Sequence, residues 1–281
     1  LFKIIINSLF LLSVYGSSLT TNNIVTYSKS NNVTEVPIDP DVGKNMFEMA
    51  ETRGYEIESH YVTTPDGYIL NMFRIPYGKN NINTKTSKTG NGNNNKPIII
   101  QHGLLNSSFT WVNNYEDQSL AYILADAGFD VWMGNNRGNR YGRNHTILNP
   151  DTDKEFWMFS WDEMGSLDMP AMVHYVTNTT GIDSIAWIGH SEGTIQMFGA
   201  VSSLTTINLN NNYLKDAIKK INLFVALAPV AYVYNLASKP IQLLAKQYIV
   251  DEIFDRGIYE VGKWDDQVCT LCIYVTMYIT M

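Results

Sequence analysis

The pattern that most restricts the fold begins at Pro97, where short apolar runs alternate with segments of helical periodicity. The first run, Ile98–Ile100, is apolar at every position, and the segment from Leu120 to Ala127 has apolar residues at i, i+3, i+4 and i+7. Later strands are predicted at Asp130–Met133, Ser184–Ile188 and Ile221–Ala228, and later helices at Met169–Val176 and Thr194–Leu204. Strands that are apolar on both faces and separated by helices predict an α/β fold, with a mostly parallel sheet covered on both sides.

Two further segments precede this alternation. The strand-like runs Glu56–Val62 and Tyr68–Ile75 flank Thr64–Gly67, in which Pro presets one φ angle and Gly accepts a positive one, so we expect a β-hairpin. Residues 78–97 then contain seven asparagines and one sizeable apolar residue, Ile82. Such a segment buries too little apolar surface to order itself, and we expect a solvated surface loop.

The N-terminal residues indicate export. Lys3, the mostly apolar run Ile4–Val14 and the small residues Gly16–Ser18 together predict a secretory signal peptide over residues 1–18; the alternative is an N-terminal core strand. The run is shorter than the roughly 20 apolar residues of a membrane span. Because the first residue is Leu1 rather than Met, we expect the true start to be missing. The sequons that weakly support export, as candidate glycosylation sites, are Asn32, Asn106, Asn144 and Asn178.

Composition limits the classes of partner and cofactor. The 281 residues fit one large domain or two of ordinary size. The 20 basic and 27 acidic residues give a net charge of −7, which disfavours binding to nucleic acid. Cys269 and Cys272 are too few for a disulfide framework, and no second ligand pair makes them a zinc site. The sequence contains no phosphate-loop motif, and without an H-E-x-x-H motif a zinc hydrolase has no basis.

The motif that carries chemistry is Gly189–Gly193, which has the pattern G-x-S-x-G. It follows the predicted strand Ser184–Ile188 and opens the helix that begins near Thr194, which is the setting of a nucleophile elbow. The turn is so tight that positions 189 and 193 must lack a bulky Cβ. Ser191 is therefore the candidate catalytic nucleophile, and the alternative is a serine that only caps the helix.

A serine that attacks an ester needs hydrogen-bond donors for the oxyanion that develops. One donor is the backbone N–H of the residue after the nucleophile, here Glu192. The second is expected from the loop His102–Leu105, directly after an earlier strand, and we assign it to the N–H of Leu104. Gly103 belongs to the same loop, and we expect His102 to support it by a hydrogen bond rather than act as the catalytic base.

With the elbow, these features resemble the acid lipase family of α/β-hydrolases, which includes the gastric and lysosomal acid lipases. The other matching segments, in order, are Thr64–Tyr68, His102–Leu105, Asn136–Asn139, Phe156–Trp157, Phe159–Met164, Asp168–Ala171 and Ala226–Ala231. The resemblance extends from Pro37 to Met281. It implies an α/β-hydrolase core over residues 19–230 and the start of a helical cap over residues 231–281.

The resemblance also implies an activity and a location. Members of the family hydrolyse neutral lipid esters, triacylglycerols or sterol esters, through an acyl-enzyme and without a metal or cofactor. The implied substrate lies at a membrane or lipid-droplet surface, and the implied location is the lysosome or the extracellular space. Two other functions stay open, which are a carboxylesterase acting on small soluble esters and a non-catalytic lipid-binding or vestigial protein.

The sequence departs from the family in two places. The family normally has glutamine after the nucleophile, whereas Glu192 would put a carboxylate beside the oxyanion. We hypothesise that Glu192 works only when protonated; the alternative is an inert side chain that points to the surface. The family order is nucleophile, acid, histidine, but all five histidines, at positions 60, 102, 145, 174 and 190, precede Ser191. The base is therefore expected beyond Met281, in which case the chain is a fragment with little or no lipase activity.

Two smaller clusters have competing interpretations. The aromatic residues Phe156, Trp157, Phe159 and Trp161 are predicted to pack in the core, with a lipid contact as the alternative. The basic run Arg137, Arg140 and Arg143 is predicted to lie in a solvated loop.

Overall fold

The computed structural model describes residues 40–80, 96–206 and 212–232, together with residues 24–25, 35–36 and 242. The predicted signal peptide, the sequon at Asn32 and the cysteines Cys269 and Cys272 lie outside the described residues. So do residues 81–95 of the Asn-rich segment and, apart from Ala231, Tyr232 and Gln242, the whole predicted cap.

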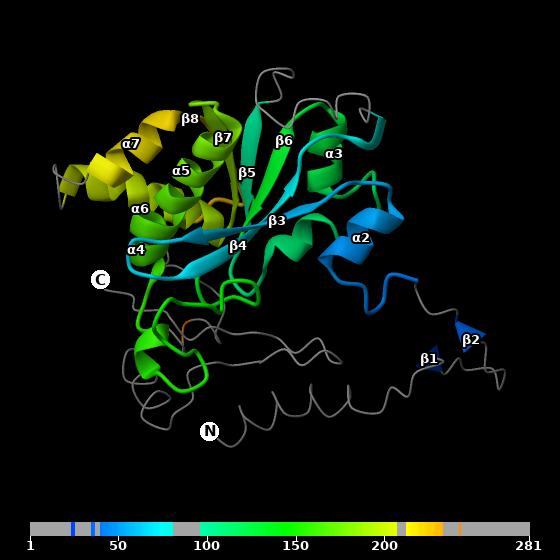
Figure 1. Cartoon of the computed structure of the whole chain (residues 1–281), viewed down its shortest axis with the longest axis horizontal. Coiled ribbons are helices and arrows are strands. Elements are labelled where there is room, and N and C mark those ends of the chain that lie inside the picture. Colours follow the sequence, from blue (N-terminus) through cyan, green and yellow to red (C-terminus); the bar gives the residue numbers. More distant parts are fainter. Residues whose placement is uncertain are drawn as a thin grey trace.

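A six-stranded sheet forms the centre of the described structure, with the strand order β3-β4-β6-β5-β7-β8 (Figure 1). Its strands are β3 (Glu58–Thr63), β4 (Ile69–Ile75), β5 (Pro97–Gln101), β6 (Asp130–Gly134), β7 (Ile185–His190) and β8 (Ile221–Leu227). Strands β6, β5, β7 and β8 are parallel, whereas the β3–β4 hairpin joins β6 in the antiparallel direction. The predicted hairpin and mostly parallel sheet are confirmed. A separate antiparallel pair consists of β1 (Ile24–Val25) and β2 (Glu35–Val36).

Helices cover both faces of this sheet (Figure 1). The α-helices are α2 (Met46–Thr52), α3 (Leu120–Asp126), α4 (Trp161–Glu163), α5 (Met169–Thr180), α6 (Glu192–Thr206) and α7 (Asn212–Lys220). Shorter turns are η2 (Ser108–Trp111), η3 (Lys154–Trp157) and η4 (Met164–Asp168). Helices α3, α5 and α6 lie where they were predicted. Helix α2 was not predicted, although Asn45 and Glu48 form a capping box at its start that the sequence already contains.

The uniformly apolar strands are explained by two separate cores. Ile98 and Ile100 of β5 pack into the core that includes Tyr122 of α3, whereas Ile99 packs into the opposite core with Trp187. Strand β6 alternates in the same way. Because successive side chains of a strand point to opposite faces, burial on both faces requires apolar residues at every position.

The Asn-rich segment was predicted incorrectly at both ends. Gly78 is buried, and Lys79 pairs with Glu116 and donates its backbone N–H to Asp126 Oδ1 at 3.1 Å. At the other end, Pro97 is already the first residue of β5. These contacts extend the ordered core into a segment whose composition alone indicated a solvated loop.

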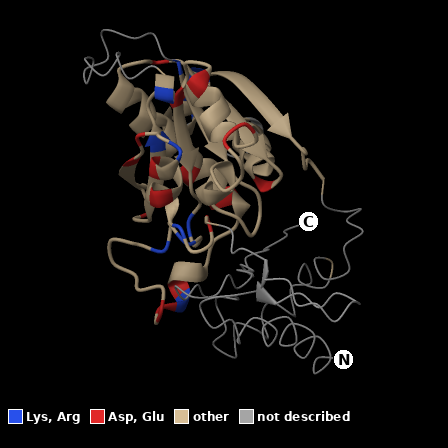
Figure 2. Ribbon diagram, turned by 90° about the vertical axis from the view of Figure 1, so that its right-hand side faces the viewer, with Lys and Arg blue, Asp and Glu red and all other residues tan. Residues whose placement is uncertain are grey.

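Charged residues of both signs are interspersed over the described ribbon (Figure 2). None of the described helices is both long enough and apolar enough to span a bilayer.

Candidate active site

Ser191 lies alone in the turn between β7, which ends at His190, and α6, which begins at Glu192. Its φ angle is 51°, in the left-handed region that non-glycine residues rarely occupy. Two hydrogen bonds hold this conformation: the Ser191 N–H donates to Leu227 O at 3.0 Å, and the Thr194 N–H donates to Ser191 O at 2.9 Å. A strained serine between a strand and a helix has the geometry of a nucleophile elbow.

The two glycines of the elbow lie where no side chain fits. A Cβ atom on Gly189 would be 2.4 Å from the carbonyl oxygen of Gly193. A Cβ atom on Gly193 would be 2.7 Å from the carbonyl oxygen of Gln101, at the end of β5. In the elbow, the backbone at Gly189 therefore packs against the backbone at Gly193, and Gly193 packs against the backbone at the end of β5.

The loop after β5 lies directly beside the elbow. A Cβ atom on Gly103 would be 3.1 Å from Ser191 Cβ, and Leu104 and Glu192 line the same pocket. The backbone N–H groups of Leu104 and Glu192 have no hydrogen-bond acceptor among the described residues. Backbone N–H groups that are free to bind a developing negative charge are what an oxyanion hole requires.

His102 is buried beneath this loop and both of its ring nitrogens are engaged. Nε2 accepts hydrogen bonds from Asn139 Nδ2 at 2.9 Å and from the Asn136 N–H at 3.3 Å, so the ring proton is on Nδ1, 2.8 Å from Gly103 O. Burial lowers the pKa of His102 to about 4, which keeps the ring neutral at neutral pH. The expected supporting hydrogen bond is present, and this ring holds the loop.

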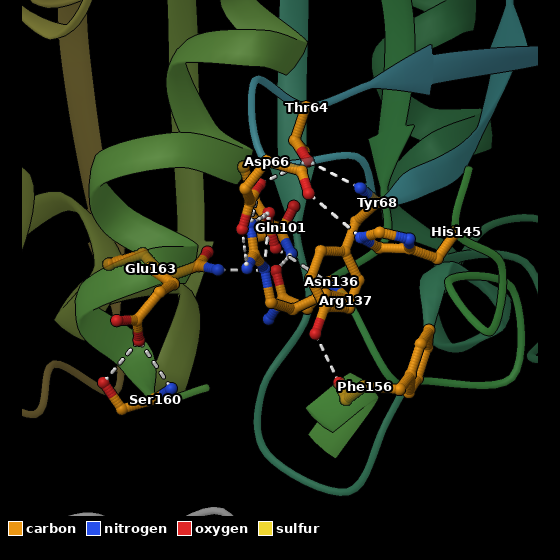
Figure 3. A network of polar contacts seen from close by, with 12 residues as sticks. Thr64, Asp66, Tyr68, Gln101, Asn136, Arg137, His145, Phe156, Ser160 and Glu163 are labelled. Atoms are coloured by element: carbon orange, nitrogen blue, oxygen red, sulfur yellow. Dashed lines mark hydrogen bonds and ion pairs between the residues drawn. The ribbon is translucent and has the colours of Figure 1, made fainter. Parts of the chain in front are cut away.

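Asn136, in the loop after β6, hydrogen-bonds side chains of β5 and α6. Its Oδ1 accepts from Gln101 Nε2 at 2.6 Å (Figure 3) and from Gln196 Nε2 at 2.5 Å, while its Nδ2 donates to Glu192 Oε2 at 3.2 Å. Glu192 thus lies on the pocket wall, and the alternative of a surface-pointing side chain was wrong. Burial raises the pKa of Glu192 to about 7, an effect that the hydrogen bond from Asn136 only partly opposes.

The prediction that Arg137 lies in a solvated loop was wrong. Its side chain is 1% exposed and forms ion pairs with Asp66 of the hairpin turn, at 2.6 Å (Figure 3), and with Asp168 at the end of η4, at 2.7 Å. The guanidinium also lies 4.1 Å from the centre of the Tyr68 ring. Burial by itself would lower the Arg137 pKa, but Asp168 and Asp66 outweigh it and raise the pKa. A charge this deeply buried is retained because two carboxylates compensate it.

The polar residues around Asn136 were missed as functional candidates, although a signal was available. The segment Asn135–Asn139 directly follows β6, a buried parallel strand. Because the carboxyl ends of parallel strands meet at one edge of a sheet, these residues reach the same edge as the elbow. Their partners Gln101 and Gln196 carried no comparable signal.

The aromatic cluster packs as a core. Phe156, Trp157 and Phe159 are at most 3% exposed, and Tyr68 donates its hydroxyl to Phe156 O (Figure 3). Trp161 is half-buried. The prediction of core packing is confirmed for the three most buried members.

Among the described residues, none hydrogen-bonds the Ser191 hydroxyl. Besides His102, three histidines have partners elsewhere: His60 with Tyr175 and Glu58, His145 with Asp66 O, and His174 with Tyr213 O. Of the sequons, Asn106, Asn144 and Asn178 are exposed, and Asn106 also lines the pocket.

Comparison with known proteins identifies the family. Residues 46–115 match the family described as "Partial alpha/beta-hydrolase lipase region", and residues 96–207 match "alpha/beta hydrolase fold". The chain is 38% identical over 242 residues to human "Lipase member M", covering 84% of this chain and 52% of that protein. This chain belongs to the acid lipase family of α/β-hydrolases.

Two other relatives have a similar degree of identity. Mouse "Gastric triacylglycerol lipase" is 39% identical, covering 82% of this chain and 54% of that protein. Human "Lysosomal acid lipase/cholesteryl ester hydrolase" is 39% identical, covering 77% of this chain and 50% of that protein. The chain spans about half the length of the curated relatives it matches.

Proposed function

We propose that the full-length protein is a serine ester hydrolase that cleaves neutral lipid esters. The observation that carries the proposal is the left-handed Ser191 between two backbone N–H groups, those of Leu104 and Glu192, that have no acceptor among the described residues. Membership of the acid lipase family supports the same chemistry.

The reaction proceeds in two steps at this site. The Ser191 oxygen attacks the acyl carbon, its proton passes to a base outside the described residues, and the carbonyl oxygen becomes an oxyanion held by the two N–H groups. Release of the alcohol leaves an acyl-enzyme. Water then attacks the acyl carbon, and the fatty acid leaves as the Ser191 hydroxyl is regenerated.

The substrate class and location are proposed from the relatives. Their names refer to triacylglycerol and cholesteryl esters, so we assign a triacylglycerol or a sterol ester at a membrane or lipid-droplet surface. Gastric and lysosomal relatives, together with the predicted signal peptide, support the secretory pathway, ending in the lysosome or outside the cell. The region after residue 230 is assigned to a cap over the site, and the exposed sequons to N-glycosylation.

The test compares hydrolysis of emulsified long-chain esters with hydrolysis of soluble short-chain esters by the full-length protein. We expect preference for the emulsified substrate and loss of at least about 10³-fold in rate for Ser191→Ala, because the nucleophile is removed. Ser184→Ala is the matched control, since Ser184 is exposed at the opposite end of β7.

The other outcomes separate the two competing functions. Faster hydrolysis of soluble esters, still dependent on Ser191, indicates a general carboxylesterase. Hydrolysis that Ser191→Ala leaves unchanged, or no hydrolysis of either substrate, contradicts the proposed activity and favours a lipid-binding or vestigial protein.

A further inference from the structure

Asn136 joins the two sides of the proposed oxyanion hole. Its backbone N–H donates to His102 Nε2 at 3.3 Å, which reaches the loop that carries Leu104. Its side-chain Nδ2 donates to Glu192 Oε2 at 3.2 Å, which reaches the first residue of α6. Asn136 therefore hydrogen-bonds both His102, which holds the loop that carries Leu104, and the side chain of Glu192.

The Asn136 amide lies between two glutamine side chains. Its Oδ1 lies 2.6 Å from Gln101 Nε2 and 2.5 Å from Gln196 Nε2, and all three side chains are buried. With two amide donors directed at Oδ1, the atom that faces Glu192 is the Nδ2 donor. In this arrangement Asn136 donates a hydrogen bond to one oxygen of the Glu192 carboxyl.

Most of the charged and titratable groups on the elements packed around this carboxyl have partners elsewhere, and His190, which ends β7, lies against Gly103 and Trp111. On the pocket wall, His102 bonds Gly103 and Asn139, and Arg137 pairs with Asp66 and Asp168. From α4, which packs on α6, Glu163 bonds Ser160 and Asp162 is exposed. Among the described residues, Asn136 is the hydrogen-bond partner of the Glu192 side chain.

We propose that Asn136 is a positioning residue that controls the protonation of Glu192, and through it the pH range in which the oxyanion hole works. This inference rests on the proposed ester hydrolysis. Removal of the carboxyl from water favours its neutral form, whereas the Asn136 donor favours its ionised form. An ionised Glu192 beside the developing oxyanion opposes the negative charge that the two N–H groups stabilise, so the rate falls as Glu192 ionises.

The first experiment measures the pH dependence of ester hydrolysis by the full-length protein. In the parent, we expect the rate to fall as pH rises through about 7, the pKa of Glu192, and Glu192→Gln to lack this fall. Asn136→Leu should move the fall upward by about one pH unit or more, because a donor to the ionised form is lost. A fall that persists in Glu192→Gln, or stays in place in Asn136→Leu, overturns the inference.

A second variant protects the test against misfolding. Asn136→Leu leaves the buried donors of Gln101 and Gln196 without an acceptor, which can prevent folding. Asn136→Asp keeps the acceptor and the shape but places a second carboxyl against Glu192, so it should move the fall upward as well. The double variant Asn136→Asp with Glu192→Gln should lack the fall, as Glu192→Gln does, and a fall that appears in it contradicts the assignment to Glu192.

A third readout does not depend on activity. Because folding raises the pKa of Glu192 from 4.5 to about 7, the folded state binds more protons in this interval, and stability declines as pH rises through it. Because His102 contributes with the opposite sign between pH 4 and 6.5, thermal unfolding is compared between variants: the stability of the parent relative to Glu192→Gln should decline as pH rises from 4.5 to about 7, whereas its stability relative to the surface control Glu155→Gln should not. In Asn136→Asp the decline should extend to higher pH. If the parent hydrolyses no ester, the proposed function fails, and this unfolding series still decides whether Asn136 controls Glu192.

Discussion

Two neighbouring turns at the same edge of the sheet are built in different ways. The elbow after β7 is held by backbone packing, in which Gly189 and Gly193 leave no room for a Cβ atom. The loop after β6 is also tightly packed, since a Cβ atom on Gly142 would be 2.2 Å from Asn136 O, but it depends in addition on buried polar side chains, above all Asn136 and Arg137. Neither turn tolerates added atoms, whereas the loop also tolerates no lost partners, and this difference can be tested by substitution.

The largest effect is expected at Arg137, the buried cation of the loop after β6. Arg137→Met leaves Asp168, which is 0% exposed, without its ion pair and should reduce the free energy of unfolding by about 3–5 kcal/mol. Denaturant unfolding measures this loss. Arg143→Met, in the same basic run but paired with the half-exposed Asp151, should cost about 1 kcal/mol or less.

Equal losses in the two arginine variants would contradict the view that side-chain pairing holds this loop. Adding Asp168→Asn to Arg137→Met removes the unpaired charge and should recover part of the stability.

At Gly189, a single added methyl group tests the backbone packing of the elbow. Gly189→Ala brings its Cβ to 2.4 Å from a carbonyl oxygen, so the backbone must shift, at a cost of about 3 kcal/mol. Gly199→Ala is the control in the following helix, because nothing lies within 4 Å of its Cβ and alanine favours a helix by about 1 kcal/mol. Equal stability of the two variants, measured by thermal unfolding, would show that the elbow is not tightly packed.

A pH dependence spread over about 2.5 pH units arises at His102. Its pKa falls from 6.5 to about 4 on folding, so between these values the unfolded state binds a proton that the folded state does not. The stability of the parent relative to His102→Gln should therefore decrease as pH falls from 6.5 toward 4, by at most about 1.4 kcal/mol per pH unit and opposite in sign to the contribution of Glu192. His174→Gln is the control for loss of an imidazole outside the site. A slope unchanged in His102→Gln would mean that another group titrates there.

The contrast between the two turns also explains what the sequence could predict. Tight backbone packing can be recognised in a sequence, because glycine is required where no Cβ atom fits. Ser191 was therefore identified from the five-residue motif Gly189–Gly193 and its position between a predicted strand and a predicted helix. The strands were predicted for a similar reason, since burial on both faces makes every position apolar, as at Ile98–Ile100.

The polar part of the site could not be recognised in this way. Whether Arg137 lies in water or between two buried carboxylates depends on Asp66, 71 residues away in sequence, and on Asp168, 31 residues away. The Gln101–Asn136–Gln196 contacts likewise join three separate segments. Long-range pairing of this kind is decided by the fold, so a basic run was interpreted as solvated although its first member is in the core.

The most direct test of the account is covalent labelling of the full-length protein with a long-chain alkyl phosphonate, followed by mass spectrometry of the peptides. The account predicts one adduct, on the peptide that contains Ser191, absent from Ser191→Ala and retained in Ser184→Ala. An adduct on another serine, or no adduct on a folded protein, would contradict the assignment of Ser191 as the nucleophile.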